Sequence, residues 1–223
     1  MTDLGAPIEA GDIRLEPLVE RHRADLKAAC AQDLEIWSIY GTSWDPDHFE
    51  AQFDDLRGRD NTYPFAVMND GKLVGMTAFL GYLPARQTVE IGNTYYVPEV
   101  RGTGFNRRVK TMLLDRAFAC GIRRVEFRVD DRNARSKAAV RKLGANQDGL
   151  IRAERITWTG HVRDTALFSI LAEEWRNLSA ALPSPPDGID SATRERRVIH
   201  RFVPALWSLG TAMRDKRLPL FRA

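Results

Sequence analysis

The chain has 223 residues, of which 43% are hydrophobic and 28% are charged. This length suits one well-buried domain with an appendage rather than two full domains. No stretch approaches the roughly 18 apolar residues of a membrane-spanning helix, and residues 1–9 lack the features of a signal peptide. We therefore expect a cytoplasmic protein, with Cys30 and Cys120 as reduced structural thiols.

The net charge of +3 is unevenly distributed. Residues 190–223 hold eight Lys or Arg and three acidic residues, so the rest of the chain is slightly acidic. Overall charge is therefore poor support for nucleic-acid binding by the main body. A proline-rich linker is predicted over 183–192, followed by a basic amphipathic extension over 193–223. We expect this extension to dock on the domain or on a second subunit of a homodimer; membrane or nucleic-acid contact is the alternative.

Five elements are predicted in the first half of the chain. They are a strand, a helix, a partly helical aromatic segment and two strands, at residues 13–17, 21–30, 33–57, 65–68 and 73–80. The pair Asp70-Gly71 lies between the last two strands and is a strong signal for a hairpin turn.

The second half alternates strand and helix before a final hairpin. Strands are predicted at 89–97, 124–129, 150–157 and 162–171, and helices at 104–120, 134–143 and 173–182. Asn133 suits the start of the middle helix and Gly144 its end. This order predicts an α/β (α+β) domain over residues 8–182, with a mixed, mostly antiparallel sheet and helices on both faces.

The most informative segment spans residues 90–108, where a strand leads through a glycine-containing loop directly into a helix. The first N–H groups of a helix lack partners and favour negative charge. Gly102 and Gly104 allow this backbone to approach an anion closely. Further positive charge is expected from Arg101, Arg107 and Arg108. The pattern predicts a pyrophosphate cradle that needs no metal; a glycine-bearing turn without a ligand is the alternative.

This segment carries a family resemblance. Arg101-Gly-Thr-Gly-Phe-Asn106 resembles the Arg/Gln-x-x-Gly-x-Gly/Ala signature of the GNAT acetyltransferases, with Asn106 replacing the small final residue. Glu90-Ile-Gly, and Asn133 with Ser136, stand where the family places its other motifs. Residues 160–171 resemble the RimJ/RimL-like branch, which acetylates protein N-termini and related amines. The similarity covers roughly residues 10–180.

The resemblance implies the GNAT fold, in which the strand ending near Val97 splays from its neighbour and pairs with the pantetheine arm of acetyl-CoA. It implies coenzyme contacts at Tyr96, Val97, Arg101, Gly102, Thr103, Gly104, Phe105, Asn106, Arg107 and Asn133. A helix-capping role alone would also explain Asn133. No metal site is expected, because the four histidines have no paired ligand spacing.

The implied reaction is direct attack of a primary amine on the thioester in a ternary complex, without a cysteine nucleophile. The amine must be neutral, and a positioned carboxylate can take its proton directly or through water. Glu90 matches the family position of this base; a structural strand glutamate is the alternative. Val140 occupies the position at which many family members carry a proton-donating tyrosine. Ser136 could donate instead, unless it is an ordinary helix-start serine.

Two classes of acceptor are considered. A protein N-terminus is the first hypothesis, and a small-molecule amine such as an aminoglycoside or polyamine is the second. A non-catalytic acyl-CoA-binding module is the rival from another class. Trp37, Tyr40 and Trp44 could line the acceptor pocket, although core packing also explains them. By family analogy, the hairpin at residues 158–163 borders the acceptor groove.

Overall fold

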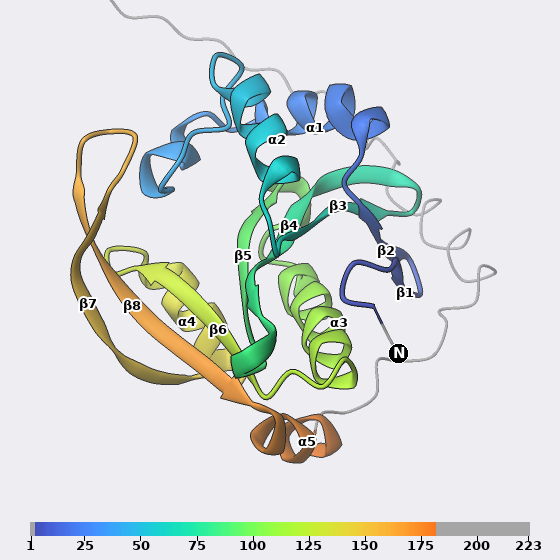
Figure 1. The fold of residues 1–223 in the computed structure, drawn as a ribbon. Coiled ribbons are helices and arrows are strands. Elements are labelled where there is room, and N and C mark those ends of the chain that lie inside the picture. Colours follow the sequence, from blue (N-terminus) through green and yellow to red (C-terminus); the bar gives the residue numbers. More distant parts are fainter. Residues whose placement is uncertain (1–2, 182–223) are drawn as a thin grey trace, which may run out of the picture. The chain divides into compact units, whose positions relative to one another are not determined.

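The computed structural model describes residues 3–181, which form an eight-stranded sheet with helices around it (Figure 1). The predicted linker at 183–192 and extension at 193–223 lie outside these residues. The strands are β1 (Ile8–Ala10), β2 (Ile13–Pro17), β3 (Tyr63–Asn69), β4 (Lys72–Leu83), β5 (Thr88–Tyr96), β6 (Arg124–Asp130), β7 (Asn146–Ile156) and β8 (Val162–Leu171). Their spatial order is β1-β2-β3-β4-β5-β6-β8-β7.

The helices account for most of the remaining chain. They are α1 (Arg23–Cys30), α2 (Phe49–Gly58), α3 (Phe105–Ala119), α4 (Ala134–Lys142) and α5 (Ala172–Ala181), with short 3-10 turns at Glu20–His22, Glu35–Ile39, Pro84–Arg86 and Pro98–Val100. Figure 1 shows α1 and α2 together, away from α4 and α5. No helix in the described range combines the length and apolar character needed to cross a membrane.

Most predicted elements are present, and two differences have clear causes. β1 was not predicted, because a strand of three residues gives almost no alternation. β7 begins at Asn146 rather than at residue 150. It is an edge strand and almost every residue is exposed, so its start carries no hydrophobic pattern.

Helices α3 and α4 end as the sequence predicts. Val109, Leu113 and Ala117 are fully buried at a spacing of four residues, so one face of α3 packs into the core. Gly121 then adopts a φ of +81°, and the N–H of Ile122 donates to the carbonyl of Ala117 at 3.1 Å. This geometry satisfies the last carbonyls of the helix. Gly144 ends α4 in the same left-handed conformation.

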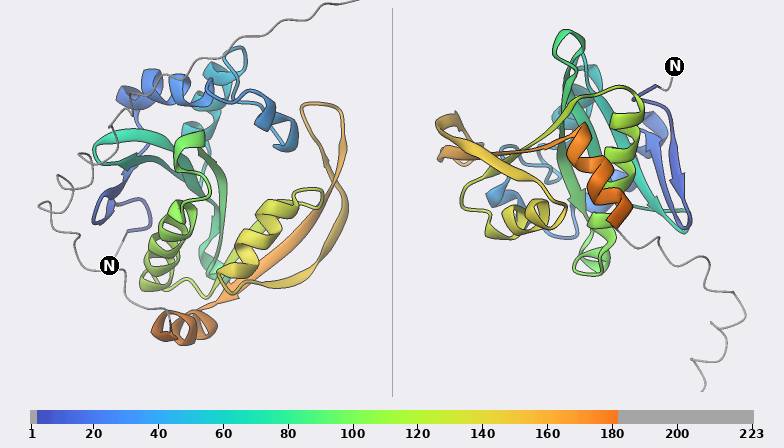
Figure 2. Two further views of the ribbon diagram at one scale, coloured as in Figure 1. Left: turned by 180° about the vertical axis from the view of Figure 1, so that it is seen from behind. Right: turned by 90° about the horizontal axis from the view of Figure 1, so that it is seen from below.

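The central strands confirm the splayed pair. Every neighbouring pair in the sheet is antiparallel except β5 and β6, which are parallel. Their pairing covers only three positions and ends where Glu90 lies opposite Glu126. Beyond that point the two strands diverge, as Figure 1 and the rear view in Figure 2 show. A mixed sheet that opens between its central strands is therefore established.

A β-bulge at the open end of β5 directs side chains to both faces of the sheet. Between the pairs Met76–Tyr95 and Ala78–Gly92, β5 holds one more residue than β4, and Asn93 has a φ of +47°. The Tyr95 hydroxyl donates to the Ala29 carbonyl in α1 at 2.8 Å. The preceding Thr94 receives a hydrogen bond from Lys110 in α3. Helices α1 and α3 therefore cover opposite faces of β5.

Candidate active site

The glycine loop, residues 101–106, lies between β5 and α3. Gly102 and Gly104 have φ values of +78° and +88°, which L side chains rarely adopt. Within residues 3–181, the backbone N–H groups of Gly102, Thr103, Gly104 and Asn106 have no hydrogen-bond partner. An ideal Cβ on either glycine would meet nothing within 4 Å. These amides at the start of a fifteen-residue helix fit a diphosphate.

Two of the three arginines predicted to add positive charge, Arg101 and Arg108, have side chains that pair with acids within the protein. Arg101 donates through Nε to the Tyr96 carbonyl at 2.7 Å and forms an ion pair with Asp33. Arg108 forms an ion pair with Asp12. Both acids lie far away in the sequence, so their positions could not be deduced from the loop. Arg107 is exposed and forms no ion pair with the described residues.

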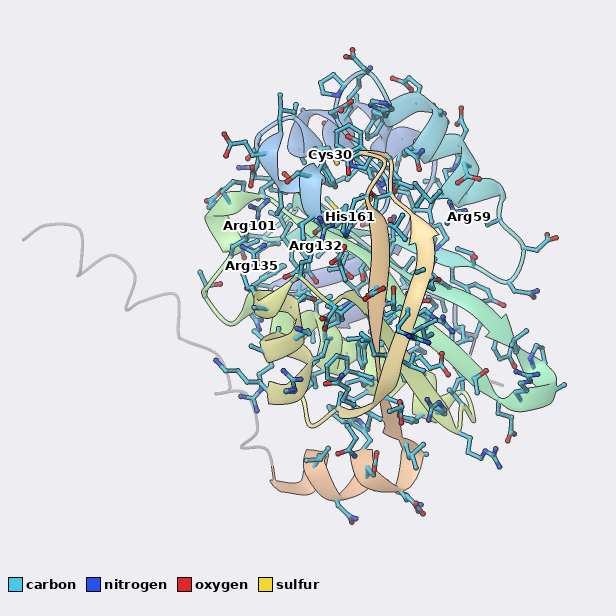
Figure 3. All side chains as sticks on the ribbon, turned by 90° about the vertical axis from the view of Figure 1, so that its left-hand side faces the viewer. Cys30, Arg59, Arg101, Arg132, Arg135 and His161 are labelled. Atoms are coloured by element: carbon cyan, nitrogen blue, oxygen red, sulfur yellow. The ribbon has the colours of Figure 1, made fainter. Side chains whose placement is uncertain are left out.

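A further arginine reaches the same region from α4. The charges of Arg101 and Arg135 both act on Tyr40, and Figure 3 shows the two arginines on the same side of the view. Arg135 is exposed and has no ion pair in the part of the chain that the structure describes. Arg107 and Arg135 therefore carry positive charges that no acid in residues 3–181 pairs with, unlike Arg101 and Arg108.

Two backbone carbonyl groups on the open edge of β5 already accept hydrogen bonds from side chains. The Val97 N–H donates to β4, at the Val74 carbonyl, so Tyr96 and Thr94 direct their backbone groups to the side that faces β6. The Thr94 carbonyl accepts a hydrogen bond from the Tyr40 hydroxyl at 2.7 Å, and the Tyr96 carbonyl accepts the one from Arg101. The N–H groups on this edge are therefore the main backbone donors for a bound chain.

Glu90 lies at the point where β5 and β6 separate. Its Oε2 is 3.5 Å from Nε of Arg128, and its side chain is 23% exposed. A Cβ at Gly92 would lie 2.7 Å from Oε1, so the glycine leaves the space that the carboxylate needs. Burial raises the pKa of Glu90 to about 6, although the charges of nearby arginines oppose this shift. A reachable carboxyl group with this pKa can act as a base near neutral pH.

Lys110 is a residue that sequence reasoning missed. It is 5% exposed, and its Nζ donates to Oγ1 of Thr94 at 2.6 Å, while Thr94 also bonds Thr77 at 2.8 Å. Burial lowers the pKa of Lys110 to about 7, and the charge of Glu90 opposes this shift. The helical period could have revealed it, because residue 110 lies on the same face as Leu113 and Ala117.

Ser136 and Asn133 lie in the first turn of α4. The Asn133 side chain accepts a hydrogen bond from the Ser136 N–H at 2.9 Å, so Asn133 is the N-cap of this helix. The Ser136 hydroxyl is half-buried and has no hydrogen-bond partner among residues 3–181. Val140 is buried against the core. Val140 therefore has no polar group to offer, whereas the Ser136 hydroxyl is unused among residues 3–181.

The three aromatic residues have different environments. Trp37 and Trp44 are 0% and 2% exposed and belong to the core, so neither presents its ring to a pocket. Tyr40 is partly exposed and contacts β5 at its open edge. At the tip of the β7–β8 hairpin, Trp158 donates through Nε1 to the Trp37 carbonyl at 2.8 Å. The hairpin therefore lies against the segment that carries Tyr40.

Two surface depressions lie elsewhere. Their volumes are about 500 and 280 Å³, and their walls include Phe118 with Arg176 and Tyr63 with Arg57, respectively. Neither contains Glu90 or any residue of the glycine loop. Neither depression therefore coincides with the residues that the sequence singled out.

Comparisons with known proteins agree with this geometry. A family model described as an acetyltransferase (GNAT) domain matches residues 12–146. A GCN5-related N-acetyltransferase from Brucella melitensis is 27% identical, with a TM-score of 0.77 over 86% of this chain and 91% of its own. A comparison with curated protein sequences gave no match.

Two further solved structures show the same fold at lower identity. Mycobacterium smegmatis RimJ in complex with CoA-disulfide is 24% identical, with a TM-score of 0.65 over 79% of this chain and 93% of its own. Spermidine N-acetyltransferase from Vibrio cholerae, in complex with CoA and spermine, is 19% identical, with a TM-score of 0.62 over 74% and 99%. The open strand pair, the loop of free amides and the family match lead to one conclusion: the chain belongs to the GNAT acetyltransferase family.

Proposed function

We propose that this protein transfers an acetyl group from acetyl-CoA to the α-amine of a protein or peptide, by direct attack in a ternary complex. The main support for the proposal is that β5–β6 pairing ends at Glu90. Glu90 lies on β5, the strand that leads to the glycine loop. When bound, acetyl-CoA supplies an acyl group activated as a thioester. The free amides of the loop and the exposed Arg107 would hold its diphosphate.

Glu90 is the proposed base. A carboxylate with a pKa of about 6 is largely ionised at pH 7 and can take a proton from the acceptor. An α-ammonium has an ordinary pKa of about 8, whereas an alkyl ammonium such as that of lysine has one of about 10.4. The smaller difference from Glu90 favours an α-amine acceptor, because less free energy is needed to neutralise it.

Ser136 is the proposed donor to the departing sulfur. Its hydroxyl is unused by the described protein, and it opens the helix that follows β6 on the other side of the strand pair. Val140 leaves no hydroxyl at the family's tyrosine position. Asn133 is engaged in capping, so its contribution to coenzyme binding would be the placement of this helix start.

A polyamine is the weaker acceptor hypothesis. The charges of Arg128, Arg155 and Arg163 all act on Glu90. An approaching polycation would be repelled by these guanidinium groups, although Glu126 and Glu154 partly offset them. The RimJ/RimL-like branch is therefore our proposed assignment within the family.

Mass spectrometry of products tests the proposal. Purified protein would be incubated with acetyl-CoA and a mixture of peptides, aminoglycosides and polyamines. Acetylated peptide α-amines are the expected product. Calorimetric binding of acetyl-CoA without acetylation of any amine would instead support a non-catalytic acyl-CoA-binding module.

A further inference from the structure

Arg163 in β8 is a buried cation without a carboxylate partner. Arg163 is only 7% exposed. Nε donates to the Thr165 hydroxyl at 2.9 Å, and Nη2 donates to the backbone carbonyl of Arg128 at 3.1 Å. It forms no ion pair with any acid in residues 3–181, and Nη1 has no hydrogen-bond partner there. Burying a charge without an ion-pair partner is costly, so the free Nη1 of Arg163 is a candidate group for binding an anionic ligand.

A second guanidinium group converges on the same place. Arg155 in β7 directs Nε and Nη2 to Glu154 at 2.5 and 2.7 Å, which leaves Nη1 without a partner in the described chain. An ideal Cβ on Gly41 would lie 3.6 Å from Nη1 of Arg163 and 3.9 Å from Nη1 of Arg155. The two Nη1 groups therefore both lie close to Gly41, which has no side chain of its own.

The surrounding segments hold this arrangement in place. The backbone N–H of Trp158, at the hairpin tip, donates to the Gly41 carbonyl at 3.1 Å. The residue before Gly41 is Tyr40, whose hydroxyl is bonded to the open edge of β5. The charges of Arg155 and Arg163 lower the pKa of Glu90, against the larger effect of burial. The free guanidinium groups thus lie near the proposed base, on the side formed by the hairpin.

We propose that Nη1 of Arg163 and Nη1 of Arg155 bind a carboxylate carried by the acceptor, so that the acceptor's amine is presented to Glu90. This inference rests on the proposed function and narrows its substrate class. A carboxylate has two oxygens in one plane, which suits donors on two guanidinium groups. The carboxylate comes from an acidic side chain near a peptide N-terminus or from a free α-amino acid.

Matched acceptors test this inference. Initial rates would be measured for short peptides that differ only in having Glu, Gln or Lys at the second position, and for free glutamate against glutamine and spermidine. We expect a KM at least about tenfold lower for the Glu peptide than for the Gln peptide, as one charge-assisted contact provides. A lower KM for free glutamate than for the Glu peptide would identify the amino acid as the source.

Variants connect the preference to the two arginines. Arg155→Gln should raise the KM of the Glu peptide to that of the Gln peptide, and Gly41→Ala should weaken the preference by placing a methyl group beside both Nη1 atoms. Arg152→Gln is the matched control, because Arg152 is an exposed arginine of the same strand with no ion pair in residues 3–181. Arg163→Gln would be included only if thermal unfolding shows that it folds.

The outcomes separate the two proposals. Acetylation of all three peptides with equal KM values overturns the carboxylate site and leaves the proposed function standing. An unchanged preference in Arg155→Gln, with a folded Arg163→Gln also unchanged, overturns it as well. Binding of acetyl-CoA with no turnover of any peptide, amino acid or amine overturns both.

Discussion

The glycine loop and the region around Glu90, the two proposed binding regions, present polar groups of different kinds. The loop offers backbone N–H groups from residues that are close in the sequence. Around Glu90, the polar groups are side chains from β5, β6, β7 and β8. A backbone site tolerates many side chains but needs particular φ values, whereas a side-chain site fails when one residue changes.

The two regions are also stabilised by different kinds of interaction. In the loop, the positive φ values of Gly102 and Gly104 direct the amides outward, and the Thr103 hydroxyl donates to the Val100 carbonyl at 2.8 Å. Near Glu90, the carboxylate depends on Gly92 for space and on Arg128 for charge. Substitutions in the loop should therefore change coenzyme binding, and substitutions near Glu90 should change turnover.

Replacing the proposed base should have the largest effect. Glu90→Gln is expected to lower kcat by about 10²- to 10⁴-fold, because the acceptor loses its proton acceptor. The wild-type rate should rise with pH through about 6, where Glu90 loses its proton, and the variant should lose this dependence. Calorimetry should show unchanged acetyl-CoA affinity. A kcat within a few-fold of wild type would remove Glu90 from the mechanism.

A substitution that strains the glycine loop should weaken coenzyme binding. In Gly104→Ala, a side chain at φ +88° costs about 1–2 kcal/mol, so we expect the KM for acetyl-CoA to rise about tenfold with little change in the KM for acceptor. Gly71→Ala is the matched control, since Gly71 has a φ of +76° and open space around it in the β3–β4 turn. Equal coenzyme KM values in the two variants would contradict the amide-loop assignment.

The proposed proton donor should have a smaller effect. Ser136→Ala is expected to lower kcat about tenfold and to leave the thermal midpoint unchanged, because its hydroxyl makes no hydrogen bond in the described chain. Asn133→Ala should instead cost about 1 kcal/mol of stability by removing the N-cap. If Ser136→Ala turns over at the wild-type rate, departure of the sulfur needs no donor from this residue.

Lys110 should affect stability in a pH-dependent way. Its pKa falls from 10.5 to about 7 on folding, so between these values the unfolded chain binds more protons and stability rises with pH. Lys110→Met should therefore raise the unfolding temperature below pH 7 by at least about 2 °C, with the difference shrinking towards pH 10.

Lys72→Met is the control for this measurement, because the Lys72 side chain is 70% exposed. It should show no such pH dependence. A Lys110→Met protein that is less stable than wild type at pH 6 would mean that the buried charge is favourably paired.

Several features could be predicted from the sequence because their causes are local. The glycines of the 101–106 loop, the cap at Asn133 and the stop at Gly121 act over one or two turns of chain. The order of strands and helices, together with the family resemblance, predicted the mixed sheet and the open central pair. The burial of Trp37 and Trp44 matched the core-packing alternative rather than the pocket hypothesis.

The tertiary structure alone decided which charges are free. Arg101 and Arg108 are neutralised by Asp33 and Asp12, which are 68 and 96 residues away. Lys110 became a buried amine because a bulge turned Thr94 towards α3. Local sequence determines backbone conformation, whereas electrostatic pairing depends on distances between segments that only folding brings together. For this reason the conformation of the glycine loop was predictable, and the two guanidinium groups beside Gly41 were not.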